Sequence, residues 1–412
     1  MKKPLLLIGS VLLSSSIAFG AAFQLNLQGI RQLAMGGTGA AVPWDASTIF
    51  YNPAGLSDLG HIQAYASIQA LTPRTRWIAT PTGAPGDMAD ANNRTYTPFN
   101  VYVGGPIADK SRIGLGVAVY TPFGTGIKWD DNWAGRYSIQ EIQLQSIFIQ
   151  PTISYKVNDI ISVGGGFVFA TGNIDLRKAV PLQSQAGADG AAELKGNANG
   201  VGYNIGLHLN ATDWLQFGIT YRSGVNMKVN RGYATFTVPS SLSSQFPYTA
   251  FKSNVNLPRV VTIGWGFKPT RNLTIQADGN FVGWSSYDSL RFDYETNTAS
   301  LQDVHTPRRY KNTFAIRLGA HYKINDRFAV MVGGAYDPSP VKDGYLSPEL
   351  PDANHYTATG GITFKPMRRM TIMGVFEYVF TDKRTGVVMT DNFAGQYQTK
   401  IINPGIGVSF DF

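Results

Sequence analysis

The residue types that carry out most enzymatic chemistry are sparse in this chain and are not grouped. Its five histidines stand apart, in no Ser/His/Asp signature and in no metal-ligand spacing: His61, His208, His305, His321 and His355. Isolated histidines of this kind are usually structural. The chain has no cysteine, which excludes disulfides, thiolate metal sites and a lipid-modified N-terminal cysteine. We therefore expect no catalytic site, no metal and no other cofactor.

Cationic side chains offer a second kind of chemistry, the binding of an anion. Lys311 and Arg317 fall on the same face of a segment in which polar and apolar residues alternate. A carboxylate in apolar surroundings needs a basic or hydrogen-bonding partner, because a buried unpaired charge is very costly. The alternative is that such cations pair with acids of the protein itself, such as Asp278 or Asp175.

The segments that hold these residues have the two-residue period of β-strands. Many of them alternate over eight to eleven residues, as in Leu273 to Phe281 and Lys311 to Leu318, and this length suits a tilted strand that crosses a bilayer. Charged residues are only 15% of the chain and aromatic residues reach 12%. Past the N-terminal region no run of 18 or more apolar residues occurs, so we expect no membrane helix. A large secreted β-sandwich or propeller also fits the composition.

Short connections alternate with long ones along the chain. The six short connections span 105–111, 156–159, 210–213, 268–272, 323–326 and 365–369. The seven long ones run approximately over 73–93, 122–138, 177–199, 229–256, 285–310, 337–354 and 381–399. Thirteen connections join fourteen strands, and bacterial outer-membrane barrels have an even number. Short turns face the periplasm in such barrels, so we expect both ends of the barrel on that side.

The two ends of the chain indicate where the protein goes. Residues 1–20 have the zones of a signal peptide: Lys2 and Lys3, an apolar run from Leu5 to Leu13, and a small-residue exit. The last strand, Gly405 to Phe412, is amphipathic and ends on an aromatic residue, which resembles the C-terminal signal that the outer-membrane assembly machinery recognises. We expect an exported protein of a Gram-negative outer membrane, in contact with outer-membrane lipid, lipopolysaccharide and the assembly machinery.

Residues 21–58 do not alternate and are too many for a simple lead-in to the first strand. They include apolar residues such as Ile49, Phe50 and Leu56, whereas a disordered tail is expected to be more polar and charged. We therefore expect residues 21–58 to form a hatch inside the lumen and residues 59–412 to form the barrel. A periplasmic tail is the alternative.

Short motifs follow one another in a fixed order along nearly the whole chain after residue 20. Near the start are Ala22-Phe23-Gln24-Leu25-Asn26, Asp45-Ala46-Ser47 and Asn52-Pro53-Ala54. Further on are Pro122-Phe123-Gly124, Ala134-Gly135-Arg136-Tyr137, Leu257-Pro258-Arg259, Asp278 with Trp284-Ser285, Ala335-Tyr336-Asp337-Pro338-Ser339-Pro340, and Pro351-Asp352-Ala353. In this combination the chain resembles the FadL/TodX family of outer-membrane transporters of hydrophobic compounds.

That resemblance implies an all-β fold, a fourteen-stranded antiparallel transmembrane β-barrel with an N-terminal hatch in its lumen. In the family a ligand enters from outside, reaches a pocket and leaves sideways through a gap at a kinked strand. The residues implied for the hatch and its gating are Phe23, Gln24, Leu25, Asn26, Asn52, Pro53 and Ala54. Lateral exit is physically sensible, because an amphiphile that re-enters water loses roughly 0.8 kcal/mol per CH₂.

Further residues are candidates for the kink, the anion site and the capture of ligand. Candidates for the kink in the wall are Pro122, Gly124, Gly126 and Pro151, although an ordinary loop start explains the first three equally well. Candidates for a ligand carboxylate are Arg177, Lys311 and Arg317, the first two by their match to the basic positions of the family. Candidates for a hydrophobic patch at the extracellular mouth are Phe123, Ile127, Trp129 and Trp133, which could equally be interfacial aromatics.

The sequence as a whole predicts passive transport rather than catalysis. We expect a monomer that takes up long-chain fatty acids or similar hydrophobic molecules, with hatch-gated lateral release into the membrane. The alternatives are uptake of monoaromatic hydrocarbons by the same fold, an outer-membrane lipid-modifying enzyme, and a general polar porin, which the plug-like segment argues against. The formal net charge of +8 is spread over turns and loops, so we expect no nucleic-acid partner.

Overall fold

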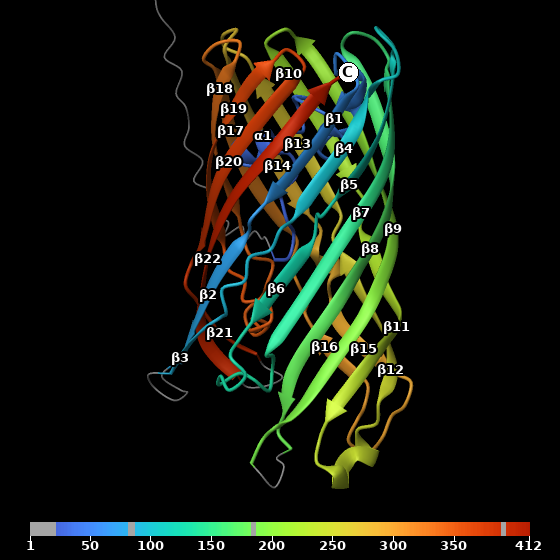
Figure 1. Cartoon of the computed structure of the whole chain (residues 1–412), viewed down its shortest axis with the longest axis vertical. Helices are drawn as coiled ribbons and strands as arrows, with labels where there is room; N and C mark the ends of the chain where they lie inside the picture. The colour runs from blue at the N-terminus through green and yellow to red at the C-terminus, as the bar shows by residue number, and fades with distance from the viewer. Residues whose placement is uncertain (1–21, 81–86, 183–186, 389–392) are drawn as a thin grey trace, which may run out of the picture.

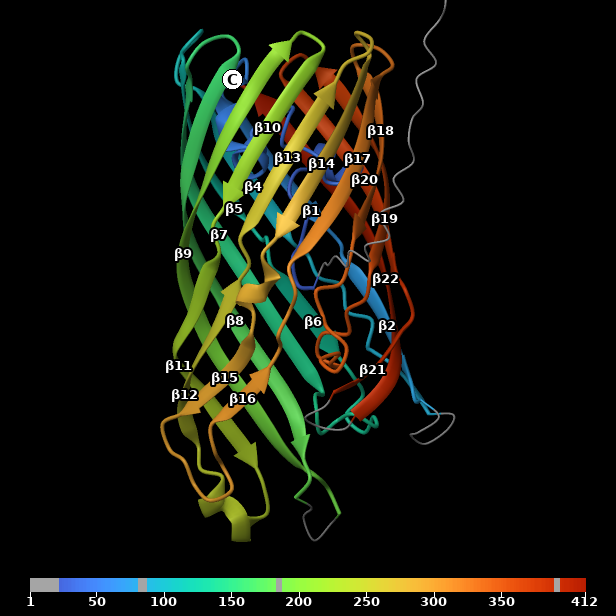
Figure 2. The same ribbon diagram turned by 180° about the vertical axis from the view of Figure 1, so that it is seen from behind.

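The computed structural model describes residues 22–80, 87–182, 187–388 and 393–412. The expected signal peptide therefore lies outside the described residues. Figures 1 and 2 show a single tall barrel of tilted strands, with the N-terminal residues inside one of its ends. Within the described ranges, no helix has the length and apolar character needed to cross a membrane.

Fourteen antiparallel strands form the wall, and several of them are interrupted, so that the strand segments are numbered to β22. In the first half they are β1 Gln63–Gln69 with β2 Thr72–Ile78, β4 Phe99–Pro106, β5 Ile113–Tyr120 with β6 Gly124–Lys128, β7 Glu141–Lys156, β8 Ile161–Val180, β9 Gly190–Thr212, and β10 Leu215–Arg222 with β11 Val225–Thr237. In the second half they are β12 Thr249–Leu257 with β13 Val260–Phe267, β14 Leu273–Val282 with β15 Ser289–Tyr294, β16 Val304–Pro307 with β17 Thr313–Lys323, β18 Phe328–Asp337, β19 His355–Met367, β20 Met370–Thr381 with β21 Arg384–Val388, and β22 Phe393–Asp411. The short β3 Met88–Asp90 pairs with β2, and the 3₁₀ turns η2 Ser240–Gln245 and η3 Trp284–Ser286 lie between β11 and β12 and between β14 and β15.

The first and last strands close the barrel. β1 pairs antiparallel with β22 from Gln63 opposite Asp411 to Gln69 opposite Gly405. Closure joins the two ends of the sheet, and it satisfies there the backbone polar groups that lipid cannot. The predicted fourteen-stranded fold is therefore confirmed.

Several of the expected long loops are largely strand, which corrects the sequence-based boundaries. β8 continues to Val180 and β9 begins at Gly190, inside the expected loop 177–199. β11 likewise continues to Thr237 inside the expected loop 229–256, and β22 begins at Phe393 inside 381–399. Beyond the lipid layer the outward face no longer has to be apolar, so the alternating pattern fades while the hydrogen-bonded ladder continues.

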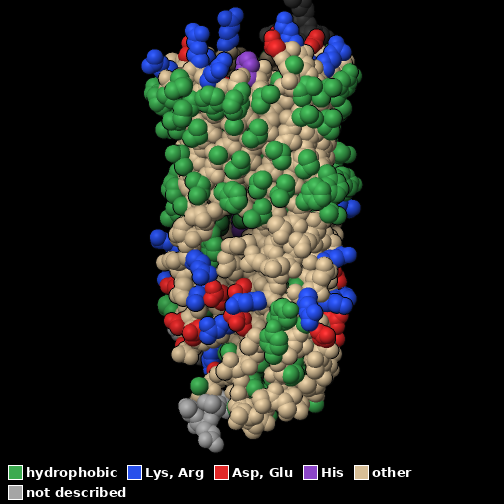
Figure 3. Space-filling model, turned by 45° about the vertical axis from the view of Figure 1, so that its right-hand side comes forward, with side chains coloured by type: hydrophobic (Ala, Val, Ile, Leu, Met, Phe, Trp, Pro, Cys, Tyr) green, Lys and Arg blue, Asp and Glu red, His purple; other side chains and the backbone are tan. Residues whose placement is uncertain are grey.

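The outer surface has a hydrophobic belt over only part of its height. Figure 3 shows hydrophobic side chains around the half of the barrel that carries the short turns, and charged side chains at the turns and on the opposite half. Ile153, Phe167 and Leu318 are among the exposed apolar residues of this belt. Phe412 is 61% exposed at its edge, as expected for a lipid-facing last residue. Since short turns face the periplasm, we assign the opposite, longer half to the extracellular side.

The residues before β1 fold inside the turn-side end of the barrel (Figures 1 and 2). They form the short helices α1 Ile30–Ala34 and α2 Thr48–Tyr51 and the 3₁₀ helix η1 Pro53–Asp58. Their apolar side chains, including Leu33, Ile49 and Leu56, are fully buried. This N-terminal segment, residues 22–59, therefore fills the lumen at that level.

Candidate ligand-binding site

Asn52 fixes the N-terminal segment against the wall through its amide side chain. The amide nitrogen donates to the carbonyl oxygens of Ala40 (2.8 Å) and Leu207 (3.0 Å), and the amide oxygen accepts from the Ala54 N–H (3.1 Å). Two wall glycines make room for this turn. A Cβ at Gly206 would lie 2.1 Å from the Asn52 side-chain oxygen, and one at Gly164 would lie 2.6 Å from the Pro53 backbone. Any side chain at either position would push the segment away from the wall.

Charged wall residues hold the segment at a second level. The Asp278 carboxylate accepts from the N–H groups of Gly39 (2.8 Å) and Ala40 (3.1 Å). Arg317 donates to the Gly36 carbonyl (3.3 Å) and to both carboxylate oxygens of Asp337 (2.7 and 2.8 Å). The polar inward faces of these strands are therefore occupied by the backbone of the segment.

The third wall strand is broken at residues 121–123, between β5 and β6. Tyr120 pairs with Phe148 of β7, and Gly124 pairs with Gln145. From Tyr120 to Gly124 the broken strand advances by four residues, while β7 advances by three between their partners. The extra residue in the broken strand is a β-bulge. On its other edge β6 pairs with no strand in the described part of the chain, because β4 begins only at Phe99. The wall therefore has a gap between β6 and residues 93–98, which ends where the Asn92 N–H donates to the Lys128 carbonyl (2.7 Å).

The start of the N-terminal segment lies directly against this gap. The Leu25 N–H donates to the Pro122 carbonyl (2.8 Å), and the Gly124 N–H donates to the Phe23 carbonyl (3.0 Å). Gln24 consequently forms an isolated antiparallel bridge with Phe123. The ring of Phe23 packs against those of Trp284 and Tyr287, with centroids 4.9 and 5.4 Å away. The segment thus supplies the strand pairing that the wall lacks here.

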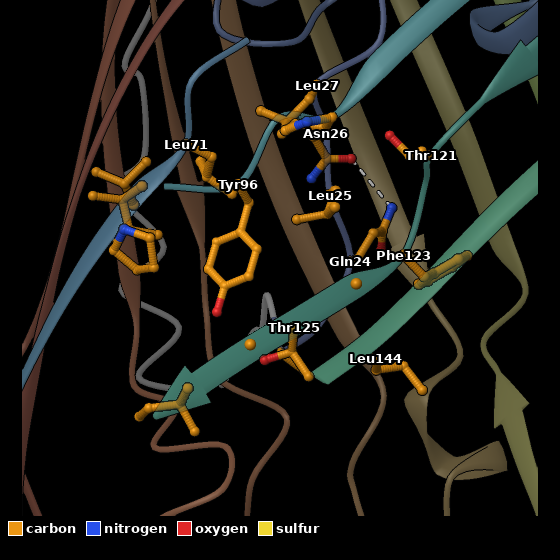
Figure 4. Close-up of a pocket in the computed structure, with 18 of the residues that line it drawn as sticks. Gln24, Leu25, Asn26, Leu27, Leu71, Tyr96, Thr121, Phe123, Thr125 and Leu144 are labelled. Atoms are coloured by element: carbon orange, nitrogen blue, oxygen red, sulfur yellow. Dashed lines mark hydrogen bonds between the residues drawn. The ribbon is translucent and has the colours of Figure 1, made fainter. Parts of the chain in front are cut away.

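A cavity of about 580 Å³ opens at the gap. This volume is in the range that suits a small-molecule ligand. Figure 4 shows side chains from the N-terminal segment, the first strand and the broken strand around it, with Gln24 and Asn26 joined by a hydrogen bond. Its apolar lining includes Leu25, Leu27, Leu71, Phe123, Ile127 and Leu144. The Tyr96 hydroxyl covers Gly126, where a Cβ would lie 2.1 Å from it.

The opposite side of the cavity is polar and carries more acids than bases. Its acidic and basic lining consists of Arg94, Arg317, His355, Asp337, Glu349, Asp352 and Glu377. Within this set Arg317 is bound to Asp337, and Glu377 accepts from the Asn403 amide (2.7 Å). Arg317 therefore reaches the cavity, as the sequence predicts, but with an acidic partner already in place. That partner is Asp337, and neither Asp278 nor Asp175.

The lumen above the N-terminal segment is mainly apolar, although Arg308, Glu349 and Asn173 also line its cavities. Two small cavities of about 40 and 20 Å³ lie there, lined by inward-facing side chains of β7, β8, β11 and β12: Ile142, Leu144, Ile174, Met227, Val229 and Val255. The first shares Thr125, Leu144, Glu349 and Leu350 with the large cavity. A hydrophobic molecule entering from outside would meet an apolar surface down to the gap.

Arg308 is a buried cation of this region that the sequence did not single out. It lines the first small cavity, donates to the Ser347 hydroxyl (3.2 Å) and pairs with Glu349 (2.5 Å). Burial lowers the pKa of Arg308, but Glu349 and Tyr287 outweigh that effect, so the pKa is raised above its usual value. Its local sequence has no strand period, so only the folded loop brings it to the lumen.

Two other predicted anion ligands lie outside these cavities. Arg177 is half-buried on the extracellular part of β8, opposite Glu141 and Glu193 in the ladder. Lys311 precedes β17, and its N–H donates to the Pro340 carbonyl (3.0 Å). Burial and, to a lesser extent, Arg384 lower the pKa of Lys311. Neither residue lines the large cavity or the two small ones, so their proposed role gains no support from these cavities.

The predicted aromatic patch is packed rather than exposed. Trp129 and Trp133 are 0% and 5% exposed and stack with ring centroids 4.3 Å apart. The Trp129 indole N–H donates to the Pro348 carbonyl (3.1 Å). Phe123 and Ile127 are also buried, but they line the large cavity. The side-chain pattern alone could not distinguish a loop core from a surface patch.

Of the four candidates for the kink in the wall, three lie at the gap and one does not. Pro122 lies in the break, and Gly124 and Gly126 line the cavity. Pro151 lies inside the unbroken β7 and faces outward, and the β7–β8 register is the same on both sides of it. It therefore makes no opening.

The comparisons with known proteins agree with this architecture. Residues 11–412 match the family model described as outer membrane protein transport protein (OMPP1/FadL/TodX). The long-chain fatty acid transport protein of Salmonella typhi is 25% identical over an alignment of 382 positions that covers 86% of this chain and 86% of that one. A solved FadL homologue of Pseudomonas aeruginosa has a TM-score of 0.79 at 19% identity, covering 96% of this chain and all of that one. The toluene transporter TodX of Pseudomonas putida has a TM-score of 0.72 at 16% identity, covering 93% and 98%.

The matched family is one of outer-membrane transport proteins and not of enzymes, and its model covers nearly the whole chain. The chain therefore belongs to the OMPP1/FadL/TodX family and is an outer-membrane transporter of hydrophobic compounds.

Proposed function

We propose that this transporter carries long-chain fatty acids or similarly hydrophobic molecules from outside into the plane of the outer membrane. The observation that carries the proposal is the cavity of about 580 Å³ that opens at a gap in the wall. The apolar lumen above it supports a path inward from the extracellular side. Release through the gap keeps the ligand out of water, which would otherwise oppose release by roughly 0.8 kcal/mol per CH₂.

In this proposal, residues 22–58 act as a hatch. Phe23 to Leu25 bond to Pro122 and Gly124 at the gap, while Asn52 and its neighbours hold the rest of the segment against the wall. Among the described residues, two backbone hydrogen bonds join the first part to the broken strand, and the Ala22 N–H also donates to Asp352 (3.2 Å), so a ligand that competes for this space would have to displace these bonds. The deeper part stays fixed while its tip moves.

The substrate class depends on whether an anion is bound. The relative from Salmonella typhi is named for long-chain fatty acids, and a carboxylate would need a cation such as Arg308 or Arg317. Both of these arginines are paired with acids, and acids outnumber bases in the cavity lining. That observation favours a second candidate, an uncharged hydrocarbon such as the toluene named for TodX.

Blocking the gap tests lateral release. Gly126→Leu adds bulk where the cavity meets Tyr96, whereas Gly360→Leu adds the same bulk on β19, where the nearest atom to a Cβ is 3.8 Å away. Uptake of radiolabelled palmitate by cells that lack their own transporter of this class should fall for Gly126→Leu and stay unchanged for Gly360→Leu. Equal uptake by both variants would rule out exit through this gap.

A binding comparison separates the two substrate classes. The purified protein is titrated with palmitate, with palmityl alcohol and with toluene, and displacement of a fluorescent fatty acid is measured. A carboxylate site predicts tighter binding of palmitate than of the alcohol, lost in Arg308→Gln or Arg317→Gln. Equal binding of acid and alcohol, with displacement by toluene, would instead support the uncharged class.

A further inference from the structure

A groove of about 570 Å³ lies on the outside of the wall, separate from the lumen. It runs across β7, β8, β9 and β11. One end is apolar and is formed by Ile149, Phe169 and Val201, which are 42%, 51% and 60% exposed. The other end is polar and is formed by Thr171, Asn199, Asn226 and Lys228. The groove is thus amphipathic along its length.

The polar end continues as a row of side chains across six strands. The strand registers place these residues opposite one another in turn, so their side chains share the outward face. From β8 to β16 the row is Thr171, Asn199, Lys228, Asn254, Arg291 and His305. It contains two permanent cations and no acid.

The cations of this row are not neutralised by the protein. Neither Lys228 nor Arg291 has a carboxylate within 4.0 Å among the described residues, and Arg291 donates only to the Ser289 hydroxyl (3.1 Å). Asp293, two residues after Arg291 on β15, is opposite Lys252. Lys195, by contrast, is a cation on β9 bound to Glu193 (2.6 Å) and Asp175 (3.6 Å). The row therefore keeps its positive charge available to an external partner.

The groove lies where the lipid-facing surface ends. Exposed apolar residues of β8 and β9, such as Val163, Phe167 and Ile205, lie on its turn side, and beyond Phe169 and Val201 the outward residues are polar. Figure 3 shows the corresponding change, from a hydrophobic belt to uncharged polar and charged side chains. This level is that of the headgroups of the outer leaflet.

We propose that this groove binds a phosphorylated glycolipid of the outer leaflet, the lipid A part of lipopolysaccharide. Its acyl chains pack on Ile149, Phe169 and Val201, and its phosphate binds Lys228 and Arg291. Charge-assisted contacts to phosphate favour this pairing, and the asparagines offer hydrogen bonds to sugar hydroxyls. The site is independent of the transport path, because none of its residues lines the inner cavity.

Lipid titrations by native mass spectrometry test the site on the full-length protein. The ligands are lipid A, lipid A with its phosphates removed, and phosphatidylglycerol. Two exposed charge-assisted contacts together amount to about a tenfold difference in Kd, which corresponds to about 1.4 kcal/mol. We expect the parent protein to bind lipid A about tenfold more tightly than either other lipid, and the variant K228Q/R291Q to lose this preference.

The matched control is Lys195→Gln, which removes an equally exposed cation that is already paired with acids. It should keep the preference for lipid A. If K228Q/R291Q discriminates between lipid A and its dephosphorylated form as well as the parent does, the phosphate binds elsewhere and the proposal is wrong. Equal binding of phosphatidylglycerol and lipid A would also overturn it. Thermal unfolding of both variants should match the parent, because these side chains are exposed.

Discussion

At the scale of single residues, the face of the strand on which a side chain lies was predictable, but its partner was not. The sequence places Arg317 on an inward face, and the structure agrees, but its partner Asp337 could not be predicted. The two side chains meet because the β17–β18 register brings Arg317 opposite Ala335, two residues before Asp337. Such a register depends on the whole barrel and not on the local pattern. For the same reason Arg308 was missed and Trp129 was expected at the surface.

Gly164 tests the close approach of Asn52-Pro53-Ala54. In Gly164→Ala the new methyl group would lie 2.6 Å from the Pro53 backbone, so the free energy of unfolding should fall by about 1–3 kcal/mol. Gly360→Ala, with no atom closer than 3.8 Å, should change it by no more than about 0.5 kcal/mol. Equilibrium unfolding in detergent measures both. An unaffected Gly164→Ala protein would mean that the segment is not held here.

The Arg317–Asp337 pair tests the role of buried charge. The side chains are only 6% and 10% exposed. Arg317→Met leaves the buried Asp337 carboxylate without its cation, so it should lower the free energy of unfolding by about 3–5 kcal/mol. The double variant R317M/D337L should recover much of that loss. Arg76→Met removes a pair whose side chains are 56% and 59% exposed and should lower it by no more than about 1 kcal/mol. Arg317 also donates to the Asn280 side-chain oxygen (3.1 Å), and failure of the double variant to recover stability would show that Arg317 acts mainly through Gly36 and Asn280.

At the scale of elements, the tight turns were predictable and the extent of the strands was not. Turn residues such as Asn158-Asp159 and Asn325-Asp326 break the period clearly, and the six short connections occur where they were expected. The extracellular extensions of β8 and β9 carry polar residues on their outward faces, which the alternation cannot detect. The break between β5 and β6 had a local signal in Pro122 and the nearby glycines, but its pairing with Phe23 to Leu25 joins residues a hundred positions apart.

That pairing allows the hatch to be locked. Gln24 and Phe123 form a non-hydrogen-bonded antiparallel pair, in which Cα atoms are about 4.5 Å apart and a disulfide fits. The chain has no cysteine of its own, so Q24C/F123C introduces the only pair. Oxidation should reduce palmitate uptake several-fold by holding the tip of the hatch at the gap, and a reductant should restore it.

The single variant Gln24→Cys controls for the substitution itself. Its palmitate uptake should change neither on oxidation nor on addition of a reductant. Closure of the disulfide can be followed by the shift of the unreduced protein on a gel. If the fully oxidised double variant transports as fast as the reduced one, the N-terminal tip does not move during transport. Release would then need no hatch displacement.

At the scale of the whole molecule, the barrel and the N-terminal segment depend on each other unequally. The wall closes through β1 and β22, both of which lie outside the segment, so the barrel is closed without it and loses only the pairing of Phe23 to Leu25 with the broken strand. The inward polar groups do depend on it, because Gln150, Asp278 and Thr359 bond to the backbone of the segment. Without the segment these groups would be solvated, and the lumen at that level would be a water-filled pore.

Deletion of residues 23–56 should therefore leave a folded barrel that conducts ions. In planar bilayers the intact protein should show little current and the deletion variant a large, steady conductance, while both keep the β-sheet circular dichroism spectrum of the parent. The oxidised Q24C/F123C protein is the matched control, since it keeps the segment in place and should stay closed. A folded deletion variant with the low conductance of the intact protein would mean that the extracellular lumen, lined by Ile174, Met227 and Val255, is the real barrier to water and ions. In that case the segment would serve release of the ligand and not closure of the pore.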